Sequence, residues 1–128
     1  MATKATLSED IDFYLRSIRV NVEALPRVEQ RWSDPEVPAF VTPDDLLADR
    51  VSFRDEWRDL MDRLESRLHR PFLAGHMSDA QADAYRALLS LIDAMLPLMG
   101  RMRLKPPPPA VLADAATDSD ARSSTVVN

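Results

Sequence analysis

Hydrophobic residues recur at steps of three and four in three stretches of the chain, the spacing that gathers side chains on one face of an α-helix. These stretches cover roughly residues 7–32, 43–69 and 79–100. No stretch of useful length alternates apolar and polar residues as a half-buried β-strand does. The pattern therefore predicts an all-α fold.

The first stretch carries its charged residues opposite an apolar stripe, as an amphipathic helix does. The stripe consists of Leu7, Ile11, Tyr14, Leu15, Ile18, Val22 and Leu25. Ser8, which two acidic residues follow, is typical of a helix N-cap. Pro26 lacks a backbone N–H and clashes with the preceding turn, so we expect it either to kink this helix or to end it near Leu25.

The second stretch follows an extended connection over residues 33–42 that contains two prolines. It opens with Thr42-Pro43-Asp44-Asp45, where an N-cap, a proline at the first helical position and first-turn acids predict a helix start. Its apolar stripe consists of Leu46, Phe53, Trp57, Leu60, Met61, Leu64 and Leu68. A second cap-like sequence at Ser52 leaves an alternative, a short turn followed by a helix from about Ser52 to His69.

The third stretch opens with Ser78-Asp79-Ala80-Gln81, the sequence of a capping box. Its apolar residues cover a wider arc than one core face requires; they are Tyr85, Leu88, Leu89, Leu91, Ile92, Met95, Leu96 and Met99. Pro97 is expected to bend the helix, and Gly100 is expected to cap its end.

Short connections between long helices favour antiparallel neighbours, so the prediction for residues 1–105 is a small antiparallel three-helix bundle. Residues 106–128 begin with four consecutive prolines, which favour polyproline II, and continue with a segment rich in Ala, Asp, Ser and Thr. A segment with so little apolar surface cannot order itself. We therefore expect a disordered, flexible tail whose removal leaves the fold intact.

Composition excludes several classes of function. A chain of 128 residues with 45% apolar content suits one globular domain. Glycine occurs twice and cysteine is absent, which excludes glycine-rich phosphate loops, dinucleotide-binding turns, disulfide scaffolds and thiolate metal sites. No apolar run approaches the roughly 18 residues that span a bilayer, so we expect a cytoplasmic protein with no membrane partner. Arginine outnumbers lysine 14 to 2, a bias typical of a GC-rich bacterial genome.

Candidate catalytic and metal-binding groups are few. His69 and His76 lie near acids, but their spacing does not match the inward-facing Glu-x-x-His pairs of metal sites in helical bundles. Asp55, Asp59 and Asp62 share a ridge that could hold magnesium, although the arginines between them indicate a solvated charged face. We expect no catalytic residue, metal or cofactor, and an all-helical metal-dependent hydrolase ranks last among the candidate functions.

Basic residues form two candidate sites once the helices are placed. The C-terminal ends of the first and third helices share one pole of an up-down-up bundle. That pole would gather Arg27, Arg31, Arg101, Arg103 and Lys105, and a second set on one flank of the second helix consists of Arg63, Arg67 and Arg70. Arginine suits the recognition of phosphate and carboxylate, although cations at helix C-termini are also favourable caps. The net charge of −5 leaves room for a local basic patch only.

The apolar arc of the third helix has two interpretations. Leu91, Met95, Met99 and Met102 either lie buried between the other helices or form an adaptable surface for a partner. We expect a non-catalytic helical interaction or assembly subunit of a larger bacterial complex, which binds a protein partner or a second copy of itself through this face or an arginine-bearing flank. The alternative is a nucleic-acid-associated subunit of a ribonucleoprotein. Small helical subunits of CRISPR effector complexes have this size and shape, which is an analogy of fold alone.

Overall fold

The computed structural model describes residues 4–34 and 41–113. The predicted all-α class is confirmed for these residues, which form helices and their connections and include no strand. Their elements are α1 (Lys4–Glu23), α2 (Leu25–Ser33), α3 (Pro43–Arg63), a π-helical turn η1 (Leu64–His69), α4 (Arg70–Leu73) and α5 (Asp79–Met102). The prediction of three helices undercounts these elements, because Pro26 and the π turn divide two of the predicted helices.

Helices α1 and α2 are the two halves of the first predicted helix. Pro26 lies in the first turn of α2, where its missing N–H breaks no bond, and Ala24 joins the halves while its carbonyl accepts from the N–H of Val28. The predicted N-cap at Ser8 is wrong, since α1 begins at Lys4. The carbonyl oxygen and Oγ of Ser8 instead accept hydrogen bonds from Nε2 of Gln81, which joins α1 to the start of α5.

Helix α3 begins where the sequence predicts. The hydroxyl of Thr42 accepts from the N–H of Asp45, and the carboxylate of Asp45 accepts from the N–H of Thr42, both at 3.1 Å. The alternative start at Ser52 is wrong, because α3 continues through that position. Beyond α3 the helix widens into η1, in which the N–H of Arg70 donates to the carbonyl of Glu65, five residues back.

Helix α5 has the predicted capping box between Ser78 and Gln81, and Pro97 lies inside the helix without ending it. The predicted cap at Gly100 is wrong, because α5 extends to Met102. Arg103 ends the helix in the left-handed conformation, with φ of 57°. The N–H of the following Leu104 donates to the carbonyl of Met99 at 2.9 Å, which closes the last turn.

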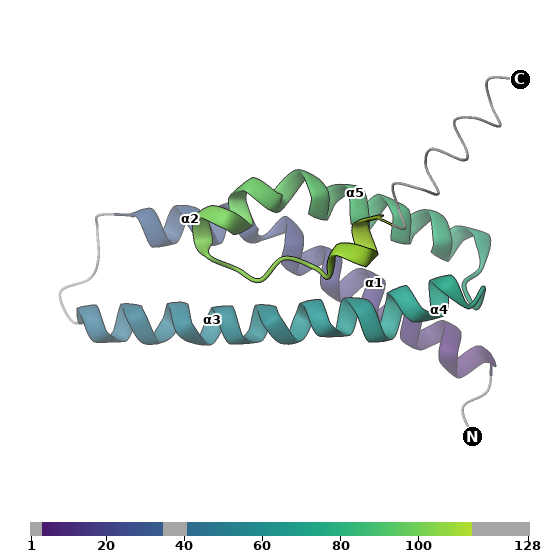
Figure 1. The fold of residues 1–128 in the computed structure, drawn as a ribbon. Helices are drawn as coiled ribbons and strands as arrows, with labels where there is room; N and C mark the ends of the chain where they lie inside the picture. Colours follow the sequence, from purple (N-terminus) through teal and green to yellow (C-terminus); the bar gives the residue numbers. More distant parts are fainter. Residues whose placement is uncertain (1–3, 35–40, 114–128) are drawn as a thin grey trace, which may run out of the picture.

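In Figure 1, α1 with α2 and α5 run in one direction along the molecule, and α3 runs in the opposite direction. Helix α1 packs on α5 and on η1, while α2 packs on the end of α5. The core between them consists of buried residues from every long helix, among them Ile18, Leu25, Met61, Leu64 and Ile92. The pole where α2 and α5 end lies beside the first half of α3, and this pole carries the candidate site.

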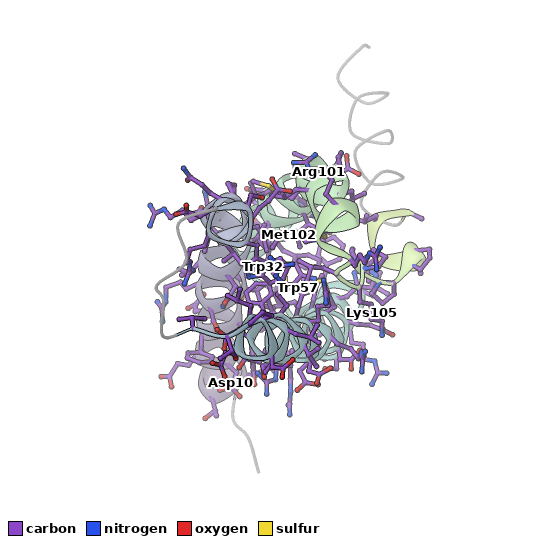
Figure 2. The ribbon with its side chains drawn as sticks, turned by 90° about the vertical axis from the view of Figure 1, so that its left-hand side faces the viewer. Asp10, Trp32, Trp57, Arg101, Met102 and Lys105 are labelled. Carbon is purple, nitrogen blue, oxygen red and sulfur yellow. The ribbon has the colours of Figure 1, made fainter. Side chains whose placement is uncertain are left out.

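The chain immediately after α5 packs against the bundle, although the sequence analysis predicts a tail from residue 106 onward. Residues 104–113, here called the C-terminal strap, turn back and lie between α5 and α3 in both views (Figures 1 and 2). Val111 is only 1% exposed and belongs to the same core as α5. Residues 104–108, which include three of the prolines, are extended, and residues 109–113 form a short helical turn that carries Val111 into the core. Residues 114–128 of the predicted tail lie outside the described residues.

Candidate anion-binding cleft at the end of helices α2 and α5

The apolar surface predicted on α5 is largely part of the core. Met99 and Met102 are 1% and 2% exposed, which corrects their assignment as partner-binding residues. Leu91 and Met95 are half-buried and pack against the same core. The apolar arc of α5 is wide because α1 packs on this helix and the C-terminal strap adds its own side chains to the same core.

The predicted basic pole is only partly assembled. Nε and Nη2 of Arg101 donate to the two carboxylate oxygens of Glu29 at 2.9 and 3.1 Å, a bidentate pair between α5 and α2. Nζ of Lys105 lies 3.5 Å from the carboxylate of Asp62 and so turns toward α3. Arg27 and Arg31 are exposed on α2. Arg101 and Arg103 are therefore the two members of the predicted set that line one cleft together.

The second predicted set, Arg63, Arg67 and Arg70, lies at the other end of the second helical stretch. All three side chains are exposed, and none of them lines either of the two clefts of the pole where α2 and α5 end. Their surroundings match those of ordinary solvated cations near a helix C-terminus.

Two arginines that the sequence analysis did not select complete the site. Nη2 of Arg50 donates to the carbonyl of Trp32 at 2.7 Å, and Nε of Arg54 donates to the carbonyl of Met102 at 3.2 Å. Their guanidinium carbons lie 5.4 and 5.5 Å from the centre of the Trp32 ring, within the range of cation–π contact. The spacing of four residues was visible in the sequence, but the meeting of α3 with two helix ends was not.

These side chains line a cleft of about 470 Å³, here called the arginine cleft. It is formed by Glu29, Trp32, Ser33, Leu47, Arg50, Arg54, Arg101, Met102 and Arg103. Figure 2 shows Trp32, Trp57 and Met102 directed into the interior, whereas Arg101 lies at the outer edge. The C-terminal dipoles of α2 and α5 and their last carbonyl groups attract cations, which explains how several like charges are tolerated at one pole.

Electrostatically the arginine cleft is positive. The described residues that line it supply four guanidinium groups and one carboxylate, that of Glu29. The hydrogen bonds from Arg101 lower the pKa of Glu29, and the same pair raises the pKa of Arg101. Arg50 and Arg54 are anchored by neutral carbonyl groups, and neither forms an ion pair with a carboxylate in the described part of the chain. The guanidinium groups of Arg50 and Arg54 are therefore available to an external anion.

A second cleft, of about 590 Å³, lies on the other side of Trp32 between α2 and α3. Its apolar wall includes Val28, Leu46 and Phe53, and the ring of Phe53 meets that of Trp32 edge to face at 5.5 Å. Its polar residues mix signs, with Arg31, Asp34, Asp49, Arg50 and Glu56. A cleft of mixed charge gives no preference for an anion or a cation.

The other candidate chemistry resolves into structural contacts. His69 is buried in η1, with 4% of its surface exposed, and its Nδ1 is hydrogen-bonded to the Tyr85 hydroxyl at 2.8 Å. On the acidic ridge, Arg58 lies 3.8 Å from Asp55. Within residues 4–34 and 41–113, no three His, Asp or Glu side chains come together as metal ligands would.

Comparison of the chain with known protein families, with curated proteins and with solved structures finds no match. In the two described ranges, no helix combines the length and apolar content needed to cross a bilayer.

Proposed function

We propose that this chain, an antiparallel bundle of three helical stretches, is a non-catalytic interaction subunit of a larger bacterial assembly that holds an acidic segment of a protein partner in the arginine cleft. One observation carries the proposal. Guanidinium groups from α3 and from the end of α5 converge on a cleft to which the described residues contribute one carboxylate, that of Glu29. Clusters of arginine are the usual means by which proteins recognise carboxylate and phosphate groups.

Arg50 and Arg54 are held in a way that suits them to bind an anion as well as to cap the ends of α2 and α5. A guanidinium group has five N–H donors, and the bonds of Arg50 and Arg54 to backbone carbonyls use one donor each. Contact with the Trp32 ring restricts both side chains further. Side chains already held in place lose less entropy when they bind a ligand, so the remaining donors are suited to a carboxylate.

A protein partner fits better than nucleic acid. Proteins that bind single-stranded nucleic acid stack bases on open aromatic faces. Trp32 is only half-exposed, and two guanidinium groups and the Phe53 ring already contact it. The acidic group in the cleft does not suggest catalysis, since a general acid needs a raised pKa and that of Glu29 is lowered.

The test compares binding of two probes, an oligoglutamate peptide and a single-stranded oligouridine RNA, by isothermal titration calorimetry at two salt concentrations. The variant is Arg54→Gln with Arg103→Gln, in which glutamine at position 54 still offers a donor to the Met102 carbonyl. The matched control is Arg63→Gln with Arg67→Gln, which changes the net charge equally on a distant exposed flank.

We expect the wild type and the control to bind oligoglutamate similarly and the cleft variant to bind it at least about tenfold more weakly, because charge-assisted bonds contribute roughly 1.5–3 kcal/mol each. Equal loss in both variants would show a general charge effect and would contradict the proposal. Tighter binding of the RNA, with a steep salt dependence, would replace it with the nucleic-acid alternative.

A further inference from the structure

Two exposed apolar residues continue the arginine cleft along the outer face of α3. Leu47 and Val51 are 59% and 47% exposed and lie four residues apart, so both stand on one side of the helix. Leu47 itself lines the arginine cleft. Arg54 follows Leu47 by seven residues and therefore lies on the same face. Arg50 and Arg54 thus form one continuous strip of α3 with the apolar pair, and the exposed Asp44 and Asp55 lie on the other side of that pair.

The spacing within this strip is that of a helix-binding surface. Four residues of an α-helix span about 6 Å along the axis, close to one helical turn. Apolar side chains spaced in this way fit between the side-chain ridges of a second helix that packs alongside. An extended peptide that binds by strand addition needs a sheet edge, and residues 4–34 and 41–113 contain no strand.

From this strip we infer that the segment held in the arginine cleft is an acidic amphipathic helix of a protein partner. Its apolar residues, three and four apart, contact Leu47 and Val51, and its carboxylates on the flanking turns bind Arg50 and Arg54. The inference rests on the proposed function and specifies the form of the partner. The arginine cleft favours a negatively charged partner, since its described lining has four cations and one carboxylate, and the exposed apolar pair favours apolar residues at helical spacing in that partner.

The experiment uses the full chain and two synthetic peptides of identical composition. One peptide places leucines three and four apart with glutamates along one side of the leucine face, and the other is scrambled so that leucines and glutamates have no helical period. Binding is measured by fluorescence anisotropy, and the helix content of the bound peptide is measured by circular dichroism. The variant Leu47→Ser with Val51→Ser removes the apolar pair but leaves every arginine in place. Its control is Phe13→Ser with Val20→Ser, two exposed apolar residues of α1.

We expect the periodic peptide to bind the wild type about tenfold more tightly than the scrambled peptide and to gain helix content on binding, because it buries apolar surface that the scrambled peptide cannot present in register. The Leu47 and Val51 variant should bind both peptides equally, and the α1 variant should keep the preference. Equal affinity of the two peptides for the wild type, with oligoglutamate still bound, would overturn the helix inference and leave the proposed function. Failure of oligoglutamate and both peptides to bind would overturn both.

All four substituted side chains are exposed, so the variants are expected to unfold at the temperature of the wild type. If a variant does not, charge reversal supplies the second measurement. A periodic peptide with lysine in place of glutamate should bind the wild type more weakly than the acidic peptide does, and equal affinity would also overturn the inference.

Discussion

The indole Nε1 of Trp57 donates a hydrogen bond of 2.9 Å to the carbonyl oxygen of Lys105, which fastens the C-terminal strap to α3. A buried indole N–H needs an acceptor, and here the acceptor comes from a segment 48 residues later in the sequence. The bond from Arg54 to the Met102 carbonyl joins α3 directly to the end of α5, so α3 is fastened both to α5 and to the strap that follows it.

We predict that the strap stabilises the fold. A chain that ends at residue 105 should be less stable than one that ends at residue 113, because the shorter chain loses the buried side chain of Val111. Val111→Ala in the full chain should lower the free energy of unfolding by about 1–3 kcal/mol. Urea denaturation measures both effects, and identical midpoints for the two truncated chains would contradict the assigned role of the strap.

The core of α3 and η1 should be sensitive to large-to-small substitution. Trp57→Ala and Leu64→Ala remove side chains that are almost fully buried, and each should cost about 2–5 kcal/mol through lost burial and the cavity left behind. Leu47→Ala is the control, since that side chain is exposed and its loss should cost less than about 0.5 kcal/mol. Thermal and urea unfolding would rank the three variants.

Arg103→Gly should raise stability and weaken anion binding together. Arg103 holds a left-handed conformation that strains an L-residue by roughly 1–2 kcal/mol, whereas glycine adopts it freely at a cost of roughly 0.5–1 kcal/mol in chain entropy. The expected net gain is about 0.5–1 kcal/mol, and the measurement pairs urea denaturation with oligoglutamate titration. Weaker binding with unchanged or lower stability would show that the backbone strain is absent.

The Glu29–Arg101 pair should make stability depend on pH in one direction. Because Arg101 lowers the pKa of Glu29 in the folded chain, this carboxylate contributes stability above its ordinary pKa of 4.5, and the contribution is lost as the pH falls through the lowered value. Wild type and Glu29→Gln should therefore differ at neutral pH and converge in acid. Denaturation at several pH values checks the convergence, and high salt should reduce the difference at neutral pH.

Glu29→Gln should also bind oligoglutamate more tightly, since it removes the carboxylate of the arginine cleft.

The features that could be predicted from the sequence are those formed by residues close together in the chain. The capping boxes at Thr42 and Ser78 are complete within four residues each, so they could be recognised without knowledge of the fold. The arginine cleft could not be, because its residues are near in space only after α2, α3 and α5 meet. The strap was missed because its few buried residues, Leu104, Pro107 and Val111, are isolated in a segment whose composition resembles a solvated tail.

The burial of His69 is another feature that the sequence pattern does not reveal. At the end of an amphipathic helix, a histidine followed by Arg70 has the sequence context of an exposed cation. The wider turn of η1 changes which way that position points, and His69 instead meets the Tyr85 hydroxyl inside the core. A hydrophobic stripe at steps of three and four has the same appearance whether the helix is α throughout or includes one π turn.

The π turn also sets the rotational phase of everything that follows it. One residue of an α-helix corresponds to roughly 100° around the axis, so the extra residue in η1 turns α4 by about that angle relative to an uninterrupted continuation of α3. With this rotation the ring of Phe72 lies 5.0 Å from that of Tyr85 on α5. The stretch from α3 to α4 therefore behaves as two helices of different phase joined without a loop. Its first half presents Trp57 to the strap, and its last turn presents Phe72 to the opposite end of the bundle.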